Sequence, residues 1–224
     1  MSQTIYLVRH TTPAVEKGIC YGQSDLDVAA GFPEEAAIIR ENLNLPSLPE
    51  DPRYQEKSPA GSIHTVYTSP LRRCRKLATC LFPGKNISEA GELMEIHCGE
   101  WEMRKWDQLP REQIDPWMKD FVTVRIPGGE SYLDLYHRVI PWFDKLLEMP
   151  ENSPVVLFTH GGVIRSLLAY ITGTSLAKSF NAFSLYYGCT IKITTHPGDP
   201  AGLFRHEFLS NDRSGEKEQH KPHY

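Results

Sequence analysis

The pattern of apolar and polar positions along the chain predicts strands that alternate with helices. Residues 4–8 (TIYLV) form a short run of β-branched and aromatic residues, which is typical of a buried strand. Residues 63–69 (IHTVYTS) predict a second strand, and residues 70–82 (PLRRCRKLATCLF) predict the helix that follows it. Residues 87–96 predict a third, short extended piece that ends in a bend.

Three further segments carry helical signals. Residues 33–43 begin with proline and two acids before good helix formers, as many helices do. Residues 129–149 have a helical pattern with Pro141 inside it, so we expect this proline to kink the helix or to begin a new one. Residues 154–173 predict a strand, a glycine turn and a helix.

The remaining segments complete an α/β pattern. Residues 189–196 and 203–210 predict two late strands joined by a turn, whereas the proline-rich residues 45–62 predict a surface loop. Residues 97–129 have no clean period. The alternation of strands and helices predicts a three-layer α/β/α domain with a mostly parallel sheet.

Composition narrows the class of protein. A chain of 224 residues, 40% hydrophobic and 23% charged, fits one domain, which we assign to residues 1–210, followed by a polar tail at residues 211–224. The formal net charge of −4 gives no basic bias, so we expect no nucleic-acid partner. No apolar run approaches membrane-spanning length, so we expect no membrane partner. Five cysteines without a CxxC spacing and the lack of a signal-peptide pattern predict a cytoplasmic protein with reduced thiols.

Chemically reactive side chains follow three of the predicted strands. The first strand ends in Arg9 and His10, the second is followed by Arg73, and the late strand at residues 154–159 is followed by His160. Because the carboxyl ends of parallel strands meet at one edge of a sheet, two histidines and at least two arginines should converge there. A guanidinium offers a planar fork of donors that matches phosphate oxygens, and helix N-termini add backbone N–H groups. The sequence therefore predicts a site for a phosphoryl group.

Five motifs, in chain order, resemble the set that marks the histidine phosphatase superfamily, the proteins with the phosphoglycerate mutase-like fold. They are LVRHTTP, YTSPLRRC, LMEIHCGEWE, PGGES and THGGV, and the resemblance spans about residues 4–170. Within the family, RHTTP together with KGICYGQSDLDV and GEWEM is most similar to the α-ribazole phosphatase-like branch. The resemblance implies that His10 is the nucleophile, that Arg9 and Arg73 bind phosphate, that His160 is the second pocket histidine, and that Glu95 is the proton donor.

These implied roles form a complete phosphoryl-transfer mechanism. A neutral ring nitrogen of His10 would attack phosphorus while a backbone carbonyl holds the other ring nitrogen. Glu95 would protonate the departing alkoxide and then take a proton from water, and a protonated His160 would balance charge. Because arginines and histidines supply the positive charge, we expect neither a metal nor a cofactor. One departure is Thr11, which stands where most members have glycine.

The segments around these motifs admit two interpretations each. Gln23 could line the phosphate pocket or belong to an ordinary polar turn. Tyr21 and Trp101 could bind the leaving group through an aromatic mouth. Alternatively, Trp101, Trp106 and Trp117 could pin a helical excursion to the sheet. Without the other motifs, we would interpret Arg9 and His10 as polar residues that form ordinary hydrogen bonds at the end of a strand, not as catalytic residues.

The sequence thus predicts a phosphomonoester hydrolase whose partner is a small-molecule phosphomonoester, with α-ribazole-5′-phosphate, from assembly of the cobalamin lower ligand, as the specific substrate. The rival enzymes are a phosphoglycerate mutase and a broad sugar-phosphate phosphatase. A catalytically silent module that binds a phospho-ligand is the rival of another class. His97 invites a metal reading, but the chain has no HExxH motif. Nothing in the sequence predicts the oligomeric state.

Overall fold

The computed structural model describes residues 3–46, 63, 65–149, 154–195 and 204–211 of the chain. A six-stranded sheet runs through the described part in the order β3-β2-β4-β1-β5-β6. Its strands are β1 (Gln3–Arg9), β2 (Thr65–Thr68), β3 (Ser88–Glu89), β4 (Val155–Thr159), β5 (Thr190–Thr195) and β6 (Arg205–Ser210). Strands β3, β2, β4 and β1 pair in parallel, whereas β5 is antiparallel to β1 and β6 is antiparallel to β5.

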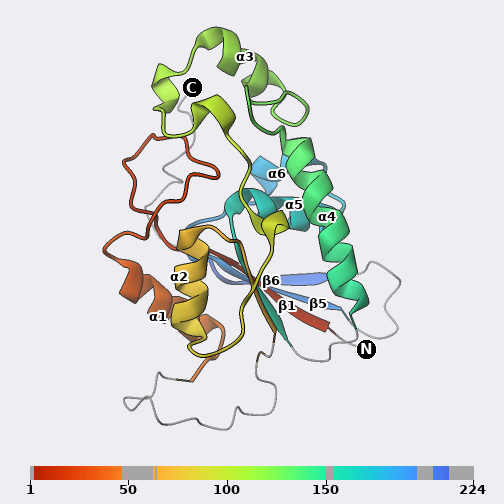
Figure 1. The fold of residues 1–224 in the computed structure, drawn as a ribbon. Helices are drawn as coiled ribbons and strands as arrows, with labels where there is room; N and C mark the ends of the chain where they lie inside the picture. Colours follow the sequence, from red (N-terminus) through yellow and green to blue (C-terminus); the bar gives the residue numbers. More distant parts are fainter. Residues whose placement is uncertain (1–2, 47–62, 64, 150–153, 196–203, 212–224) are drawn as a thin grey trace.

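Helices cover both faces of this sheet. The α-helices are α1 (Phe32–Asn42), α2 (Arg72–Leu81), α3 (Arg111–Lys119), α4 (Tyr132–Glu148), α5 (Gly161–Thr172) and α6 (Leu176–Ala182). Short 3₁₀ helices lie between β3 and α3, at η1 (Gly91–Leu93), η2 (Gly99–Trp101) and η3 (Trp106–Gln108). Figure 1 shows α1 and α2 on one side of the sheet and α4 and α5 on the other. The predicted three-layer α/β/α fold is therefore confirmed.

Two cores fill the space between the layers. Leu7 of β1 packs in the core that α4 and α5 cover, whereas the next residue, Val8, packs in the core under α1 and α2. Successive side chains of a strand point to opposite faces, so a central strand buried on both sides must be apolar at every position. This requirement explains the unbroken apolar runs at residues 5–8 and 155–158.

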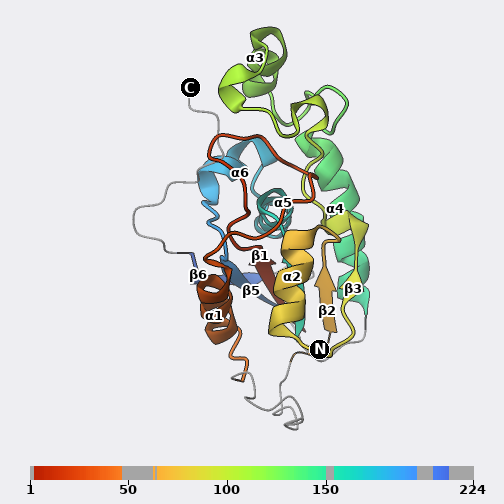
Figure 2. The same cartoon turned by 60° about the vertical axis from the view of Figure 1, so that its left-hand side comes forward.

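The carboxyl ends of the three central parallel strands meet at one edge of the sheet. Arg9 lies opposite Thr159 in the register of β1 and β4. The His10 backbone N–H donates to Thr159 O at 3.0 Å, and the Ser69 N–H donates to Phe158 O at 2.9 Å. These bonds continue the ladder past the strands and fix the residues that follow them. Figure 2 shows the loop after β1, in red, passing above α2 in that view.

The structure also departs from the sequence-based expectations. A single helix, α4, runs through Pro141 from Tyr132 to Glu148, so the proline does not begin a new helix. Helix α6 was not predicted, although Ser175 stands at its N-cap position. The predicted turn between the two late strands and the tail beyond Asn211 lie outside the described residues. No helix in the described ranges is long and apolar enough to span a bilayer.

Candidate active site

His10 is almost completely buried at the end of β1. Its Nδ1 lies 2.7 Å from the backbone oxygen of Thr11. A carbonyl oxygen can only accept, so Nδ1 carries the proton, and Nε2 of the neutral ring carries the lone pair. The predicted backbone carbonyl on the second ring nitrogen is thereby confirmed. Thr11 is absent from the described non-glycine residues with positive φ, so threonine is not strained at this glycine position.

His160, at the N-cap of α5, faces His10 with the two ring centroids 5.0 Å apart. Its Nδ1 lies 3.2 Å from Arg73 Nη2, and its Nε2 lies 2.8 Å from Ser69 Oγ. Since a guanidinium can only donate, Nδ1 accepts and Nε2 donates. Burial lowers the pKa of His160 well below its ordinary value, and Arg73, His10 and Arg9 lower it further. His160 is therefore neutral here, and its protonation beside a phosphoryl group during turnover stays a prediction.

Arg73, on the first turn of α2, is fully buried. Its Nη1 donates to Ser24 O at 2.8 Å, and its Nη2 donates to Gly22 O at 2.7 Å as well as to His160. Among its described partners there is no carboxylate, and its buried Nε has no hydrogen-bond partner. A buried cation that no acid neutralises, with a donor unused, is an unusual arrangement that favours binding of an anion.

Arg9 lies beside this cluster, where the segment before β5 holds it. Its Nη1 donates to Leu185 O, and its backbone N–H donates to Cys189 O at 3.0 Å. A Cβ at Gly161 would lie 3.3 Å from Arg9 Cζ, so glycine at the start of α5 lets the guanidinium lie close to the backbone. The structure therefore brings together all four of the predicted arginines and histidines.

Two tyrosines adjoin the cluster from opposite ends of the chain. The Tyr187 ring lies 4.3 Å from Arg9 Cζ and 5.5 Å from the His10 ring, and the Tyr21 ring lies 5.3 Å from Arg73 Cζ. The two hydroxyl groups are 2.6 Å apart. Burial raises the pKa of Tyr21 well above its ordinary value, and the neighbouring Tyr187 raises it further, so this hydroxyl stays protonated. The structure thus places Tyr21 beside the cluster with Tyr187, which the sequence-based prediction missed.

Glu95 lies in the stretch after η1, and its side chain reaches the first turn of α5. Its Oε2 accepts from the Gly162 backbone N–H at 3.1 Å, and its Oε1 accepts from the Ile96 N–H at 2.9 Å. A Cβ at Gly162 would lie 2.2 Å from Oε1, so glycine is required for the carboxylate to approach the helix. The geometry thus holds a half-buried carboxylate against the first turn of α5, the helix whose N-cap is His160.

Gln23 joins Glu95 to the loop after β1. Its side-chain Nε2 donates to the backbone oxygen of Glu95 at 3.0 Å, so this amide contacts the segment that carries the predicted proton donor. Glu102 anchors the same loop, since its carboxylate accepts from the backbone N–H groups of Gly22, Gln23 and Ser24. Burial alone would raise the pKa of Glu102, but these hydrogen bonds outweigh it and lower the pKa. The loop in turn provides the carbonyls that hold the buried guanidinium at the start of α2.

Trp101 does not line the cluster. Its side chain is fully buried in a small third core with Cys20, Cys98 and Ile114, and its Nε1 donates to Gln113 at 3.0 Å. The prediction that Trp101 binds substrate therefore disagrees with its burial. The other interpretation, in which the tryptophans pin a helical excursion to the sheet, agrees only in part. Trp101 packs edge-to-face on Trp106 and Trp117 within the excursion, and none of the described members of this core lies on a strand. Figures 1 and 2 show this excursion, which carries α3, projecting beyond the end of the sheet.

Known proteins match most of the chain. Residues 53–204 match the family model described as histidine phosphatase superfamily (branch 1), a range that contains Arg73, Glu95 and His160 but begins after Arg9 and His10. A relative described as "Probable phosphoglycerate mutase GpmB", from Salmonella paratyphi C, is 30% identical over 177 residues, which cover 75% of this chain and 74% of the relative.

Solved structures agree on the fold. The chain is similar to the α-ribazole phosphatase from Shigella flexneri, with a TM-score of 0.73 and 22% identity over 94% of this chain and 96% of that one. It is also similar to a mycobacterial glucosyl-3-phosphoglycerate phosphatase, with a TM-score of 0.70 and 22% identity over 93% of this chain and 97% of that one. The family model covers more than half of the chain, as the curated relative does. The chain belongs to the histidine phosphatase superfamily.

Proposed function

We propose that the protein is a metal-independent phosphomonoester hydrolase that forms a phosphohistidine on His10. One observation carries the proposal. His10, with its tautomer fixed by the Thr11 carbonyl, lies in a buried cluster with the Arg73 guanidinium, which no described carboxylate neutralises. A nucleophilic nitrogen beside an unneutralised buried cation is the arrangement that phosphoryl transfer requires.

In the first step, the lone pair on His10 Nε2 attacks phosphorus as the bond from phosphorus to the leaving oxygen breaks. Glu95, in its acid form, gives that oxygen a proton. In the second step, the Glu95 carboxylate takes a proton from water, and the resulting hydroxide attacks phosphorus as the bond to nitrogen breaks. Arg9, Arg73 and His160 would stabilise the phosphoryl oxygens. A phosphoryl dianion beside His160 would also raise the pKa of this histidine toward its ordinary value.

For the substrate we propose α-ribazole-5′-phosphate, in assembly of the cobalamin lower ligand. Tyr21 and Tyr187 support this proposal because they provide aromatic surface next to the phosphate-binding arginines. The flat benzimidazole of this substrate can stack on such a surface. The sequence-based hypothesis gave the aromatic mouth to Tyr21 and Trp101. Because Trp101 is buried in the third core and Tyr187 contacts Tyr21, we assign this role to Tyr21 and Tyr187.

A phosphoglycerate mutase is the second candidate, because the 30% identical relative is described as one. A mutase must retain its product and phosphorylate it again, which requires additional cations around the pocket. The lysines and arginines of the excursion are all exposed, namely Arg104, Lys105, Arg111, Lys119 and Arg125. Arg104 donates to Gln108 O at 3.3 Å, and Arg111 pairs with Asp115 at 3.5 Å. These contacts favour a phosphatase over a mutase.

The test is a direct kinetic comparison at equal pH and salt. We expect kcat/KM to be much higher for α-ribazole-5′-phosphate than for 3-phosphoglycerate, with no mutase turnover. Tyr187→Leu should lower kcat/KM for the former roughly tenfold and leave 4-nitrophenyl phosphate less affected, because one stacked aromatic contact is worth about 0.5–1.5 kcal/mol. The control is Tyr170→Phe, which removes a hydroxyl bond to Asp144 at the surface.

The outcomes separate the candidates. Preference for 3-phosphoglycerate, or mutase turnover that exceeds hydrolysis, would overturn the substrate assignment and leave the phosphohistidine chemistry intact. A protein that binds phosphate but hydrolyses no phosphomonoester of the panel would instead be the silent binding module.

A further inference from the structure

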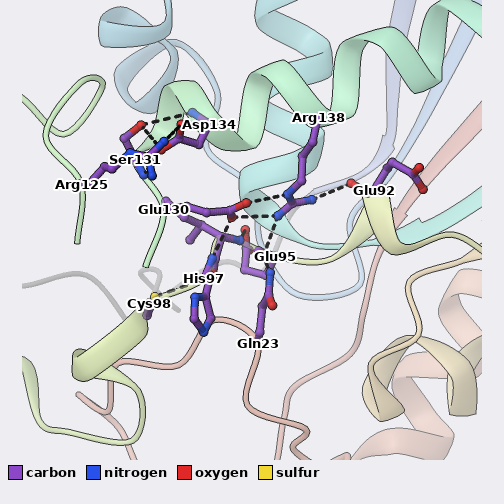
Figure 3. Close-up of polar contacts among 11 residues, drawn as sticks. Gln23, Glu92, Glu95, His97, Cys98, Arg125, Glu130, Ser131, Asp134 and Arg138 are labelled. Atoms are coloured by element: carbon purple, nitrogen blue, oxygen red, sulfur yellow. Dashed lines mark hydrogen bonds and ion pairs between the residues drawn. The ribbon is translucent and has the colours of Figure 1, made fainter. Parts of the chain in front are cut away.

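An arginine from α4 holds the backbone of the segment that carries Glu95. Arg138 Nη2 donates to the backbone oxygen of Glu95 at 2.9 Å, and Arg138 Nη1 donates to the backbone oxygen of Glu92 at 2.7 Å. Figure 3 shows the guanidinium reaching these groups from the helix. Glu92 belongs to the single-turn 3₁₀ helix η1 and Glu95 to the irregular stretch after it, so neither carbonyl is fixed by an α-helix or by the sheet.

Glu130 completes this clamp from the loop before α4. Its carboxylate accepts from Arg138 Nε at 2.9 Å and from Nη2 at 3.1 Å, which is a two-pronged ion pair. The same carboxylate accepts from the His97 backbone N–H at 2.9 Å, and the Glu130 N–H donates to His97 O at 2.9 Å. The donor residue is thus held on both sides along the chain.

We propose that Arg138 and Glu130 are positioning residues for proton transfer by Glu95. This inference rests on the proposed function, in which Glu95 protonates the leaving oxygen. The Glu95 carboxylate is oriented by the Gly162 and Ile96 N–H groups, but its distance from the cluster is set by where its backbone lies. Without the guanidinium, the carbonyls of residues 92 and 95 would lose charge-assisted bonds. The Gln23 amide alone would then hold the Glu95 carbonyl among the described contacts, and the segment would shift more easily.

The alternative is that the ion pair merely joins α4 to the loop and stabilises the fold. The two roles differ in how they depend on the leaving group. A misplaced proton donor slows the hydrolysis of alkyl phosphates, whose leaving oxygen requires protonation, and barely affects 4-nitrophenyl phosphate. A general loss of folded or well-packed enzyme lowers both rates by the same factor.

The experiment measures kcat/KM for ribose 5-phosphate and for 4-nitrophenyl phosphate in Arg138→Met, Glu95→Gln and the double variant. We expect Arg138→Met to lower the alkyl value roughly 10- to 100-fold, since a misplacement of about 1 Å has an effect of this size. The aryl value should change by less than about threefold. The double variant should lose no more on the alkyl ester than Glu95→Gln alone, because both changes act on the same proton.

The control is Arg125→Met. Arg125 forms another arginine–carboxylate pair with α4, to Asp134 at 2.6 Å, but none of its described contacts reaches residues 92–97 (Figure 3). It should leave the ratio of the two kcat/KM values unchanged. Circular dichroism of each variant shows whether it folds. If Arg138→Met does not fold, Glu130→Gln, which keeps an acceptor for the His97 N–H, should produce the same selective loss.

Three results would overturn the inference. Equal losses on the two esters in the folded variants would give Arg138 and Glu130 a purely structural role. Multiplicative losses in the double variant would show that Arg138 acts independently of Glu95. A lack of leaving-group dependence in Glu95→Gln itself would overturn the donor assignment in the proposed function as well. In the first two cases the assignment of Glu95 survives, so the two failures are distinguishable.

Discussion

A single methyl group at Gly162 should uncouple hydrolysis of alkyl phosphates from hydrolysis of aryl phosphates. Gly162 is the second residue of α5, and its N–H donates to Glu95 Oε2. In Gly162→Ala, the added Cβ would lie 2.2 Å from Glu95 Oε1 and 2.9 Å from Leu135 Cδ2. Real Cβ atoms essentially never approach another heavy atom closer than 3.0 Å, so the carboxylate oxygen must move by at least 0.8 Å.

The size of the effect follows from this displacement. A shift of about 1 Å in a catalytic group lowers the rate on the order of 100-fold, which corresponds to about 2.7 kcal/mol in the activation free energy. We therefore expect kcat/KM for ribose 5-phosphate to fall by about that factor. For 4-nitrophenyl phosphate, which has a good leaving group, it should fall only a few-fold.

Stability should change little in the same variant. Alanine is better than glycine in a helix by about 1 kcal/mol, whereas crowding against Leu135 opposes this gain by a similar amount. Thermal unfolding checks this expectation, and Gly91→Ala is the matched control, because a Cβ there meets nothing within 4 Å. If Gly162→Ala folds and hydrolyses the alkyl ester at the wild-type rate, or loses both activities equally, then Glu95 is not the proton donor.

Three further predictions concern the rest of the site. Glu102→Gln removes the charge that holds the backbone of residues 22–24. The inhibition constant of inorganic phosphate should then rise roughly tenfold, because one hydrogen bond to a charged group contributes about 1.5–3 kcal/mol. Because the folded state keeps His160 neutral, the unfolded state binds the extra proton below pH 6.5, and stability should fall by up to about 1.4 kcal/mol per pH unit as pH decreases. In urea titrations between pH 6.5 and 5, the free energy of unfolding of His160→Gln should fall less steeply with decreasing pH than that of the wild type. Since guanidinium groups supply the charge, dialysis against a chelator should leave kcat unchanged, and activity that disappears and returns with zinc or magnesium would revive the metal reading.

The main strands and the ends that carry the cluster could be predicted from local patterns. Unbroken apolar runs mark strands buried on both faces, and the residues that follow parallel strands must meet at one edge, so Arg9, His10 and His160 were expected together. The stub β3, with two residues, and the short helices of residues 97–129 have too few positions to show a period. Trp101 illustrates another limit, because an aromatic residue without a clear period can fill a small core as readily as it can line a mouth.

The residues that hold the site residues in place could not be predicted from the sequence, for a different reason. Tyr187 meets Tyr21 across 166 positions of the chain, and Arg138 meets the Glu95 backbone across 43. Such contacts depend on how loops cross over the sheet edge, which no local spacing encodes. The GEWE stretch marked the region of Glu102, but its role as an acceptor for four backbone N–H groups becomes visible only in three dimensions.

The central claim is that His10 carries the phosphoryl group during turnover. The most direct measurement is to mix the enzyme with ³²P-labelled phosphomonoester, quench rapidly without acid, and locate the label by peptide mass spectrometry. The account predicts an acid-labile, base-stable phosphate on the peptide that contains His10. The His10→Ala variant should show neither this label nor turnover. A label on another residue, or hydrolysis by His10→Ala at the wild-type rate, would contradict it.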